Sequence, residues 1–357
     1  MNKNILLITH SHCGGMERMT LLYAKILQQA GFDCRLLILQ NPSQSFEIKS
    51  FIPPTLPYDL ICCRYRYLYY ALIRYILHTK PDCVFDSTPF LVPALVFSKM
   101  LMPRLKVIFR DCNMPTTHPK KQSYPVKFIL RYADAIIAQT EEMKQEMAAF
   151  YHVDAGRITV INNPLDKELI QHKIQEKYQY PSPECTHYAA VARLAPQKDY
   201  ITMIKAFAIV LKQDKASRLE IIGNSHGYNE DYMAQLYKSI EELGIGKYIT
   251  FHGFQENPFK YMDAADVFVL SSKYEGMPNV MLEAMYLGKP VVVTRSIPYI
   301  SQVVHDGVNG YTVPVGDWER LADAMIKART LRVKEKFVNM NLSERQITDL
   351  FGEVLKS

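Results

Sequence analysis

Short apolar runs alternate with longer stretches of helical periodicity along the first half of the chain. The apolar runs predict buried strands near residues 4–9, 35–39, 83–86, 105–109, 135–139 and 158–162. Apolar positions at helical spacing predict helices near residues 16–31 and 64–79. Strands that alternate with helices are typical of a parallel sheet, so this half of the chain predicts an α/β fold.

The second half restarts the same pattern. Apolar runs predict strands near residues 188–191, 219–222, 248–251, 267–270, 291–294 and 311–313. Helical periodicity predicts helices near residues 200–211, 231–244, 258–265, 317–329 and 344–356. A second parallel sheet with its own helices is the simplest reading of this repeat.

The length of the chain, 357 residues, exceeds what a typical single core holds, and it therefore predicts two domains. Polar and charged residues dominate positions 166–183, which we interpret as a linker. We expect the first domain over residues 1–164 and the second over residues 165–340. The last helix, about residues 341–357, is expected to pack back on the first domain.

Composition narrows the class of protein only slightly. The net charge of +6 is compatible with nucleic acid, an anionic membrane surface or an anionic small substrate. No dense basic patch with a reading motif is present in the sequence, so we expect no nucleic-acid partner. The seven cysteines lack ligand spacing, which argues against structural zinc and favours a reducing cytoplasm. The apolar run Ile5 to Ile8 predicts a first strand rather than a signal peptide, and no run approaches the ~20 residues that span a bilayer.

The predicted helix over residues 64–79 interleaves five tyrosines with three arginines. One interpretation is a helix that contacts a membrane surface, because amphipathic rings and cations suit that interface. The other is a helix that packs on the core with its arginines reaching to solvent, which the spacing of its apolar residues favours. The sequence leaves both interpretations open.

Residues 271–290 read as a tight turn and a helix between two buried strands. Gly276 and Pro278 stand where the strand turns into the helix, and proline suits a first helical turn because it lacks an amide there. The free amides around Met277 and Asn279 would then form a site for an anion or for sugar hydroxyls. Two carboxylates bracket this site, Glu275 before the helix and Glu283 about one turn inside it.

Other candidate groups follow the ends of other predicted strands. Arg193 and Lys198 share the loop after residues 188–191, where they could neutralise a diphosphate without a metal ion or could simply be solvated. Arg110 follows the strand over residues 105–109, at the edge where open α/β sheets bind ligands. Gly14 and Gly15 precede the first helix, where they could let the backbone approach a ligand or form a tight turn.

With these loops in hand, the second half resembles the donor-binding domain of the family 4 retaining glycosyltransferases. Those enzymes have the GT-B fold, in which two Rossmann-like domains with parallel sheets face each other across a cleft. The resemblance covers about residues 188–330. It is carried in order by residues 192–194 with Lys198, 265–268 with 270–272, 274–279 with 283–284, and 288–291. In the first half it rests on residues 14–17, 80–82 and 163–166.

The resemblance implies a role for each matching residue. Glu275 would be catalytic and bind the hydroxyls of the donor sugar, and Glu283 would bind the ribose of the nucleotide. The loop that Arg110 begins looks like the arginine-containing loop of members that build bacterial surface polysaccharides on lipid carriers, which makes Arg110 a second catalytic candidate. The whole donor-binding set is then Gly14, Gly15, Arg193, Lys198, Gly223, Phe254, Gly276, Met277, Pro278, Asn279 and Glu283.

The implied function is a retaining glycosyltransferase that moves a hexose or N-acetylhexosamine from a nucleotide-diphosphate sugar, such as a UDP-sugar. The acceptor would be a glycan or a lipid-linked oligosaccharide in bacterial polysaccharide, lipopolysaccharide or capsule biosynthesis. The resemblance implies no cofactor and no metal, and the cysteines favour a cytoplasmic enzyme. The basic, tyrosine-rich first half suggests that this enzyme could contact the inner membrane peripherally. Alternatives are another GT-B enzyme, such as a UDP-sugar epimerase or a phosphorylase, and a non-catalytic module that binds sugar nucleotides or glycans.

Overall fold

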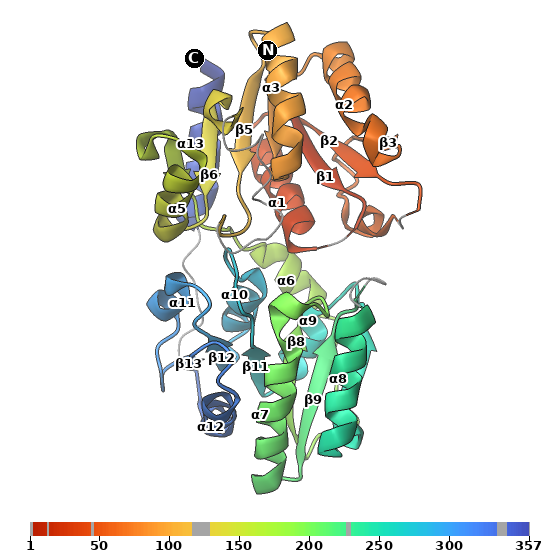
Figure 1. The fold of residues 1–357 in the computed structure, drawn as a ribbon, viewed down its shortest axis with the longest axis vertical. Coiled ribbons are helices and arrows are strands. Elements are labelled where there is room, and N and C mark those ends of the chain that lie inside the picture. Colours follow the sequence, from red (N-terminus) through yellow and green to blue (C-terminus); the bar gives the residue numbers. More distant parts are fainter. Residues whose placement is uncertain are drawn as a thin grey trace. The chain divides into compact units, whose positions relative to one another are not determined.

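The computed structural model describes residues 3–12, 14–43, 46–115, 129–225, 230–333 and 341–356. Contacts divide the chain into two compact units, and each unit holds one sheet with helices around it (Figure 1). Unit 1 consists of residues 1–164 and 339–357, and unit 2 of residues 165–338. The chain therefore leaves unit 1 once, forms unit 2, and returns for its last helix.

Unit 1 is built on a seven-stranded sheet in the order β3-β2-β1-β4-β5-β6-β7. Every neighbouring pair of strands is parallel. All residues of β4 and β6 are buried, as expected for strands that helices cover on both faces. The strands are β1 (Asn4–His10), β2 (Asp33–Gln40), β3 (Tyr58–Cys62), β4 (Cys83–Asp86), β5 (Lys106–Arg110), β6 (Ala135–Ala138) and β7 (Ile158–Val160).

Two layers of helices cover the sheet of unit 1. On one face, a core cluster that includes Leu72, Leu95 and Met147 joins the sheet to α2 (Tyr65–Thr79), α3 (Val92–Leu101) and α5 (Glu141–Tyr151). On the other face, a cluster that includes Leu27 and Phe351 joins it to α1 (Gly15–Gln29) and α13 (Asn341–Lys356). The last helix of the chain therefore completes the first unit.

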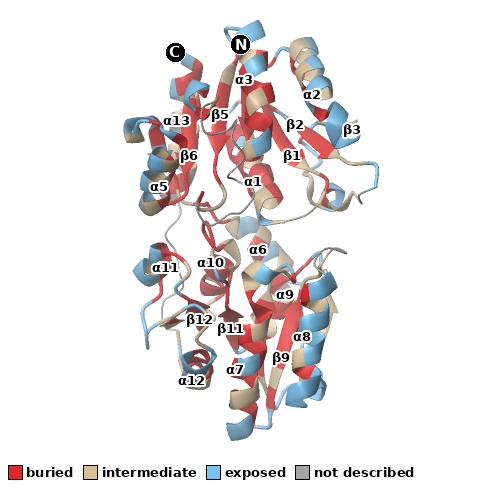
Figure 2. Cartoon of the chain, in the orientation of Figure 1, coloured by how far each residue is buried: buried red, intermediate tan, exposed pale blue. Residues whose placement is uncertain are grey.

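Unit 2 holds a six-stranded sheet in the order β10-β9-β8-β11-β12-β13, again with parallel neighbours. Its strands are β8 (Thr186–Val191), β9 (Ser217–Ile222), β10 (Ile249–Gly253), β11 (Val267–Leu270), β12 (Val291–Thr294) and β13 (Gly310–Val313). Its helices are α6 (Lys167–Lys173), α7 (Tyr200–Gln213), α8 (Glu230–Leu243), α9 (Phe259–Ala264), α10 (Asn279–Tyr286), α11 (Pro298–Val303) and α12 (Trp318–Ala328). Figure 2 shows the buried strands of both sheets and the exposed outer faces of the helices.

Short 3-10 helices mark several of the connections. They are η1 (Glu47–Phe51), η2 (Pro89–Leu91), η4 (Leu130–Tyr132), η5 (Ala155–Arg157), η6 (Pro196–Lys198) and η7 (Gly246–Tyr248). Of these, η2 and η6 follow the carboxyl ends of β4 and β8, where they shape the loops that carry candidate site residues.

The interpretation of residues 166–183 as a linker was wrong. Asp166 caps α6 through the amide of Leu169 (Oδ1 to N, 3.0 Å), and Ile170 in that helix is buried. Tyr180 is also buried, and its hydroxyl donates to the carbonyl oxygen of Tyr261 (3.0 Å). The segment is polar because α6 is a short surface helix that needs few apolar residues to anchor it.

The strand order places one ligand-binding edge in each unit. In unit 1 the chain first adds strands on one side of β1 and then continues from β4 on the other side. In unit 2 it does the same at β8 and β11. The loops that follow such a pair of strands diverge, which leaves a crevice at the carboxyl edge of the sheet where ligands of open α/β proteins bind. The loops after β8 and β11 contain residues 192–199 and 271–278, which include the predicted donor-binding residues Arg193 and Lys198 and the turn from Gly276 to Pro278.

Candidate functional site

The loops after β8 and β11 are tied together by hydrogen bonds at the carboxyl edge of unit 2. The Ser271 hydroxyl donates to the carbonyl oxygens of Lys198 (2.8 Å) and Asp199 (3.0 Å). The Gln197 side-chain amide donates to the carbonyl oxygen of Tyr274 (2.9 Å). These bonds hold together two loops that are far apart in sequence, so side chains from both loops lie close to one another at this edge.

An ion pair that is largely buried also joins the two loops. Lys198 Nζ lies 2.5 Å from Glu275 Oε1, and the hydroxyl of Ser272 donates to the same oxygen (2.6 Å). The side chains of Lys198 and Glu275 are 15% and 7% exposed. The carboxylate is thus removed from water but is compensated by a cation and a hydroxyl, which is the condition for keeping a charge buried.

The turn after Glu275 leads into helix α10 as the sequence predicts, with one correction. Pro278 is the residue that precedes the helix (φ −77°, ψ 87°), and Asn279 is the first helical residue. Gly276 and Met277 are buried in the turn. Glu283 is the fifth residue of α10 and is also buried. A carboxylate therefore lies at each end of the segment from Glu275 to Glu283, with the turn and the start of α10 between them.

Gly223 holds the end of β9 against the loop after β8. Its φ is +139°, and a Cβ atom at this position would lie 2.0 Å from the carbonyl oxygen of Ala192. Its amide donates to the carbonyl oxygen of Gly253 (2.8 Å), one residue before the half-buried Phe254. Arg193, next to Ala192, is exposed. The structure therefore places Arg193, Gly223 and Phe254 along the same edge of the sheet, where only glycine fits at position 223.

Arg110 is not the first residue of the loop after β5, contrary to the sequence prediction. It is the last residue of β5 and is 1% exposed. Its guanidinium donates to Asn163 Oδ1 and lies 3.1 Å from Cys112 Sγ and 5.6 Å from the ring centroid of Tyr23. The strand continues one residue further than the apolar pattern shows, which carries the arginine into the core of unit 1.

Buried polar atoms without a partner gather at the carboxyl edge of unit 1. Among the described residues of this unit, the atoms at strand ends that lack a hydrogen-bond partner are Thr9 Oγ1, Ser11 Oγ, Asp86 Oδ1, Ser87 Oγ, Arg110 Nε and Gln139 Oε1. They follow or end β1, β4, β5 and β6, whose carboxyl ends share one edge of the sheet. Unpaired buried polar atoms are costly, so ordered water or a polar ligand would stabilise this edge, which makes it a candidate binding place.

Two of the groups at this edge have strongly shifted pKa values. Burial raises the pKa of Asp86 to about 7, although the Thr88 amide donates to its Oδ2 (3.0 Å). Burial and the neighbouring His12 lower the pKa of His10 to about 4. His10 Nε2 lies 3.1 Å from the Thr88 hydroxyl. Asp86 is not among the residues that the sequence predicts for a site, because a carboxylate at the end of a strand is also common at a solvated surface.

Gly14 and Gly15 form the start of helix α1. The amide of Gly14 donates to Glu17 Oε2 (3.1 Å), and a Cβ atom at position 14 would lie 2.7 Å from that oxygen. Gly15 is the first residue of the helix. The glycine pair is therefore used in a tight helix start whose first amide is occupied by Glu17, and the role of the pair in donor binding remains a prediction.

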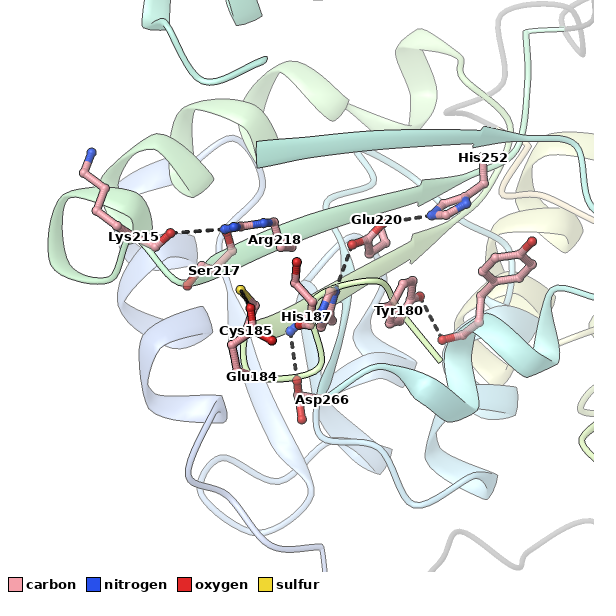
Figure 3. Close-up of polar contacts among 12 residues, drawn as sticks. Tyr180, Glu184, Cys185, His187, Lys215, Ser217, Arg218, Glu220, His252 and Asp266 are labelled. Atoms are coloured by element: carbon pink, nitrogen blue, oxygen red, sulfur yellow. Dashed lines mark hydrogen bonds and ion pairs between the residues drawn. The ribbon is translucent and has the colours of Figure 1, made fainter. Parts of the chain in front are cut away.

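A second buried polar cluster lies within the sheet of unit 2 (Figure 3). Glu220 accepts hydrogen bonds from His187 Nδ1 and His252 Nε2, each at 2.8 Å, and the Tyr180 ring stacks on His187 at 4.3 Å between centroids. Burial opposes charging of His187, but its hydrogen bonds to Glu220 and to the Ser182 carbonyl outweigh burial and raise its pKa. Burial would raise the pKa of Glu220, but its two histidine partners lower it. These groups satisfy one another, which makes the cluster a structural tie between β8, β9 and β10.

Metal-binding clusters and membrane-spanning helices are both absent from the described part of the chain. There, no group of three or more histidine, cysteine, aspartate or glutamate side chains is placed to hold a metal ion. None of the helices over the same residues is both long enough and apolar enough to cross a membrane.

The predicted site residues thus fall into two groups, one at the carboxyl edge of each sheet. The group in unit 2 contains Glu275, Lys198, Arg193, Gly223, Phe254, Glu283 and the turn from Gly276 to Asn279. The group in unit 1 contains Gly14, Gly15 and Arg110. Ser272 and Asp86 were not predicted as site residues. Ser272 lies in the matching segment 270–272, where the polar pair Ser271-Ser272 directly after an apolar strand was the available signal.

Two family models and several known proteins match this chain. Residues 13–169 match the model for Glycosyltransferase Family 4, and residues 179–342 match the model for Glycosyl transferases group 1. An uncharacterized glycosyltransferase of Methanocaldococcus jannaschii is 27% identical over 241 residues, which cover 63% of this chain and 58% of that protein. The chain thus spans less than two thirds of that relative.

Two other similar proteins have more informative names. A Campylobacter jejuni protein is 25% identical over 297 residues, covering 79% of this chain and 77% of that protein. Its name is N-acetylgalactosamine-N,N'-diacetylbacillosaminyl-diphospho-undecaprenol 4-alpha-N-acetylgalactosaminyltransferase. The crystal structure of Anabaena HepE in complex with UDP-glucose has a TM-score of 0.77 and 18% identity, covering 99% of each chain.

These matches agree with the two parallel sheets, and the predicted GT-B fold is confirmed. The two family models adjoin one another and together cover most of the chain. The chain therefore belongs to the glycosyltransferases, with a family 4 domain in its first half and a group 1 domain in its second.

Proposed function

We propose that this glycosyltransferase moves a hexose or N-acetylhexosamine from a nucleotide-diphosphate sugar to a glycan or lipid-linked oligosaccharide. The nucleotide of the donor is UDP in this proposal, which the complex of the structurally similar HepE with UDP-glucose supports. The transfer retains the anomeric configuration of the donor. The product belongs to bacterial polysaccharide, lipopolysaccharide or capsule biosynthesis. The observation that carries the proposal is the buried pair between Lys198 and Glu275 at the carboxyl edge of unit 2.

The ion pair has the properties that a diphosphate-sugar site needs. A diphosphate that enters the edge competes with Glu275 for the ammonium of Lys198, and the exposed Arg193 adds a second cation from the same loop. When Lys198 binds the diphosphate, Glu275 keeps its hydrogen bond from the Ser272 hydroxyl. Its carboxylate can then accept a hydrogen bond from a sugar hydroxyl. Glu283, buried in α10, would accept from the ribose.

In the proposed reaction the protein chiefly positions the reactants and stabilises charge. The bond between the anomeric carbon and the diphosphate oxygen breaks, and the acceptor oxygen bonds to the same face of that carbon. The proton of the acceptor hydroxyl passes to the departing phosphate. Lys198, Arg193 and the start of α10 stabilise the negative charge that develops on the leaving group, a role that fixed cations and backbone amides can fill without a metal ion.

We place acceptor recognition on unit 1. The support is the set of unpaired buried polar atoms at its carboxyl edge, which suits a ligand rich in hydroxyl groups. The name of the Campylobacter relative describes a diphospho-undecaprenol-linked saccharide, which supports a lipid-linked oligosaccharide as the acceptor class. Arg110 contributes by holding this edge together, because its guanidinium is already bonded to Asn163.

A ligand screen tests the donor assignment. The chain has one tryptophan, Trp318 in α12, so tryptophan fluorescence reports on the unfolding of unit 2. We expect UDP and one UDP-sugar to raise the unfolding midpoint of unit 2, because a ligand that binds only the folded state stabilises it. If no nucleoside diphosphate or sugar nucleotide raises the midpoint, the proposal fails. Product analysis then separates transfer from epimerisation and phosphorolysis.

A further inference from the structure

The outer surface of helices α2 and α3 carries an unusual set of exposed side chains. In α2, Leu68, Leu72 and Ile76 face the core, so one stripe of this helix packs as the sequence predicts. Ile73 and Tyr75 of α2 also pack against the core, and so does Leu95 of α3, but other large side chains of the two helices are exposed. The exposed apolar and aromatic residues of this surface are Tyr65, Tyr67, Tyr69, Tyr70, Phe97, Met100 and Leu101, and Met100 is 72% exposed. We call this the α2–α3 surface.

The α2–α3 surface is cationic as well as apolar. Residues 60–81 and residues 87–110, which include both helices, contain no aspartate and no glutamate. Arg64, Arg66 and Arg74 are exposed, and within the part of the chain that the structure describes none of them forms an ion pair. The guanidinium of Arg66 lies 4.7 Å from the ring centroid of Tyr67.

The helical spacing gathers these groups on one outward face. At 100° per residue, Arg66, Tyr70 and Arg74 are successive i, i+4 neighbours, and Tyr67 is three residues before Tyr70. This stripe lies opposite the buried residues of α2. α3 packs beside α2 over the same face of the sheet, so the exposed residues of both helices lie on the same outer layer of unit 1 (Figure 1).

From this surface we propose that unit 1 docks on an anionic lipid bilayer through α2 and α3. Tyrosine rings and long apolar side chains suit the boundary between headgroups and acyl chains, and arginines without carboxylate neighbours suit a negatively charged leaflet. A second copy of this chain is a poorer partner, because the same face would bring like charges together.

The α2–α3 surface lies next to the carboxyl edge of the sheet in unit 1. The hydroxyl of Tyr69 donates to the carbonyl oxygen of Phe90, and the Phe90 ring lies 6.1 Å from that of His10 at the end of β1. The tyrosine-rich start of α2 therefore adjoins the carboxyl edge of unit 1, where we place the acceptor. Docking would bring that edge to a membrane-anchored acceptor; this last step rests on the proposed function, whereas docking itself does not.

Vesicle sedimentation at low salt tests the docking. We expect the wild-type protein to sediment with phosphatidylcholine vesicles that contain phosphatidylglycerol, and less with pure phosphatidylcholine. Each cation near an anionic surface contributes about fivefold in affinity, so Arg66→Gln/Arg74→Gln should lose about 25-fold. Tyr67→Ser/Tyr70→Ser should lose binding to the same vesicles without any change in charge.

The controls are matched substitutions in unit 2. Lys212→Gln/Lys238→Gln removes two exposed charges, and Tyr237→Ser removes an exposed tyrosine. Both should sediment like the wild type. The proposal is overturned if the wild type does not sediment with anionic vesicles, or if the control variants lose as much as the α2 variants. It is also overturned if the wild type dimerises and Tyr67→Ser/Tyr70→Ser abolishes the dimer, since a second copy then covers the surface. UDP binding requires no lipid, so these results and the donor screen fail independently.

Discussion

Replacing Lys198 by methionine isolates the contribution of the buried ion pair. Methionine keeps the length of the side chain but strands the carboxylate of Glu275, whose side chain is 7% exposed, with the Ser272 hydroxyl as its known donor. Removing one partner of a buried pair typically costs about 3–5 kcal/mol of folding stability. Because the lysine keeps 15% exposure, we expect about 3 kcal/mol at pH 7.

Urea unfolding followed by Trp318 fluorescence measures these values for unit 2. The double variant Lys198→Met/Glu275→Gln should regain about 2 kcal/mol relative to Lys198→Met, because no charge is left unpaired. We expect Lys198→Met to lower the affinity for the donor by 30-fold or more (about 2 kcal/mol). The double variant should not regain this affinity. The control Lys238→Met removes one partner of an exposed pair and should cost under about 0.5 kcal/mol. A Lys198→Met variant as stable as this control at pH 7 would refute the reasoning.

Three further predictions concern unit 2 and the reaction. Folding raises the pKa of His187, so the stability that its protonated form contributes is complete below the ordinary pKa of 6.5 and is lost as the pH rises above that value. The difference in unfolding midpoint between the wild type and Glu220→Gln should therefore shrink as the pH rises above 6.5. A difference that stays constant with pH would contradict this prediction. Gly223→Ala should destabilise unit 2 by about 3 kcal/mol and weaken UDP binding, whereas Gly244→Ala, at φ +64° with nothing within 4 Å of its Cβ, should cost about 1 kcal/mol and leave binding intact. Sugar transfer should continue at its full rate in EDTA, measured as product formed per minute; complete loss with recovery on adding Mg²⁺ would show that the leaving group needs a metal.

The strands of this protein could be predicted because most of them are buried on both faces. β4, β6, β11 and β12 are uniformly buried and stand out as apolar runs. The edge strand β3 was missed, since its residues are alternately exposed and half-buried. Helix α3 was missed because it is apolar on most of its circumference, which removes the helical period from the sequence.

The site was predicted only in part, because its central contact is not local. Lys198 and Glu275 are 77 residues apart, and nothing in either segment indicates that they form an ion pair. The sequence suggested separate roles, with Lys198 on phosphate and Glu275 on sugar. The structure adds that each is the other's partner, and under the proposed function donor binding would include an exchange of partners. Arg110 was misplaced because a charged residue that ends a buried strand reads as the start of a loop.

The most direct test of the central claim follows the anomeric proton of the sugar by NMR. The wild-type protein is incubated with the sugar nucleotide that stabilises unit 2 and with a diphosphate-linked lipid saccharide, and Glu275→Gln serves as the matched control. We expect a new glycoside with the anomeric configuration of the donor, formed by the wild type and not by the variant. Epimerised sugar nucleotide, sugar 1-phosphate without a glycoside, or equal product from Glu275→Gln would contradict the account.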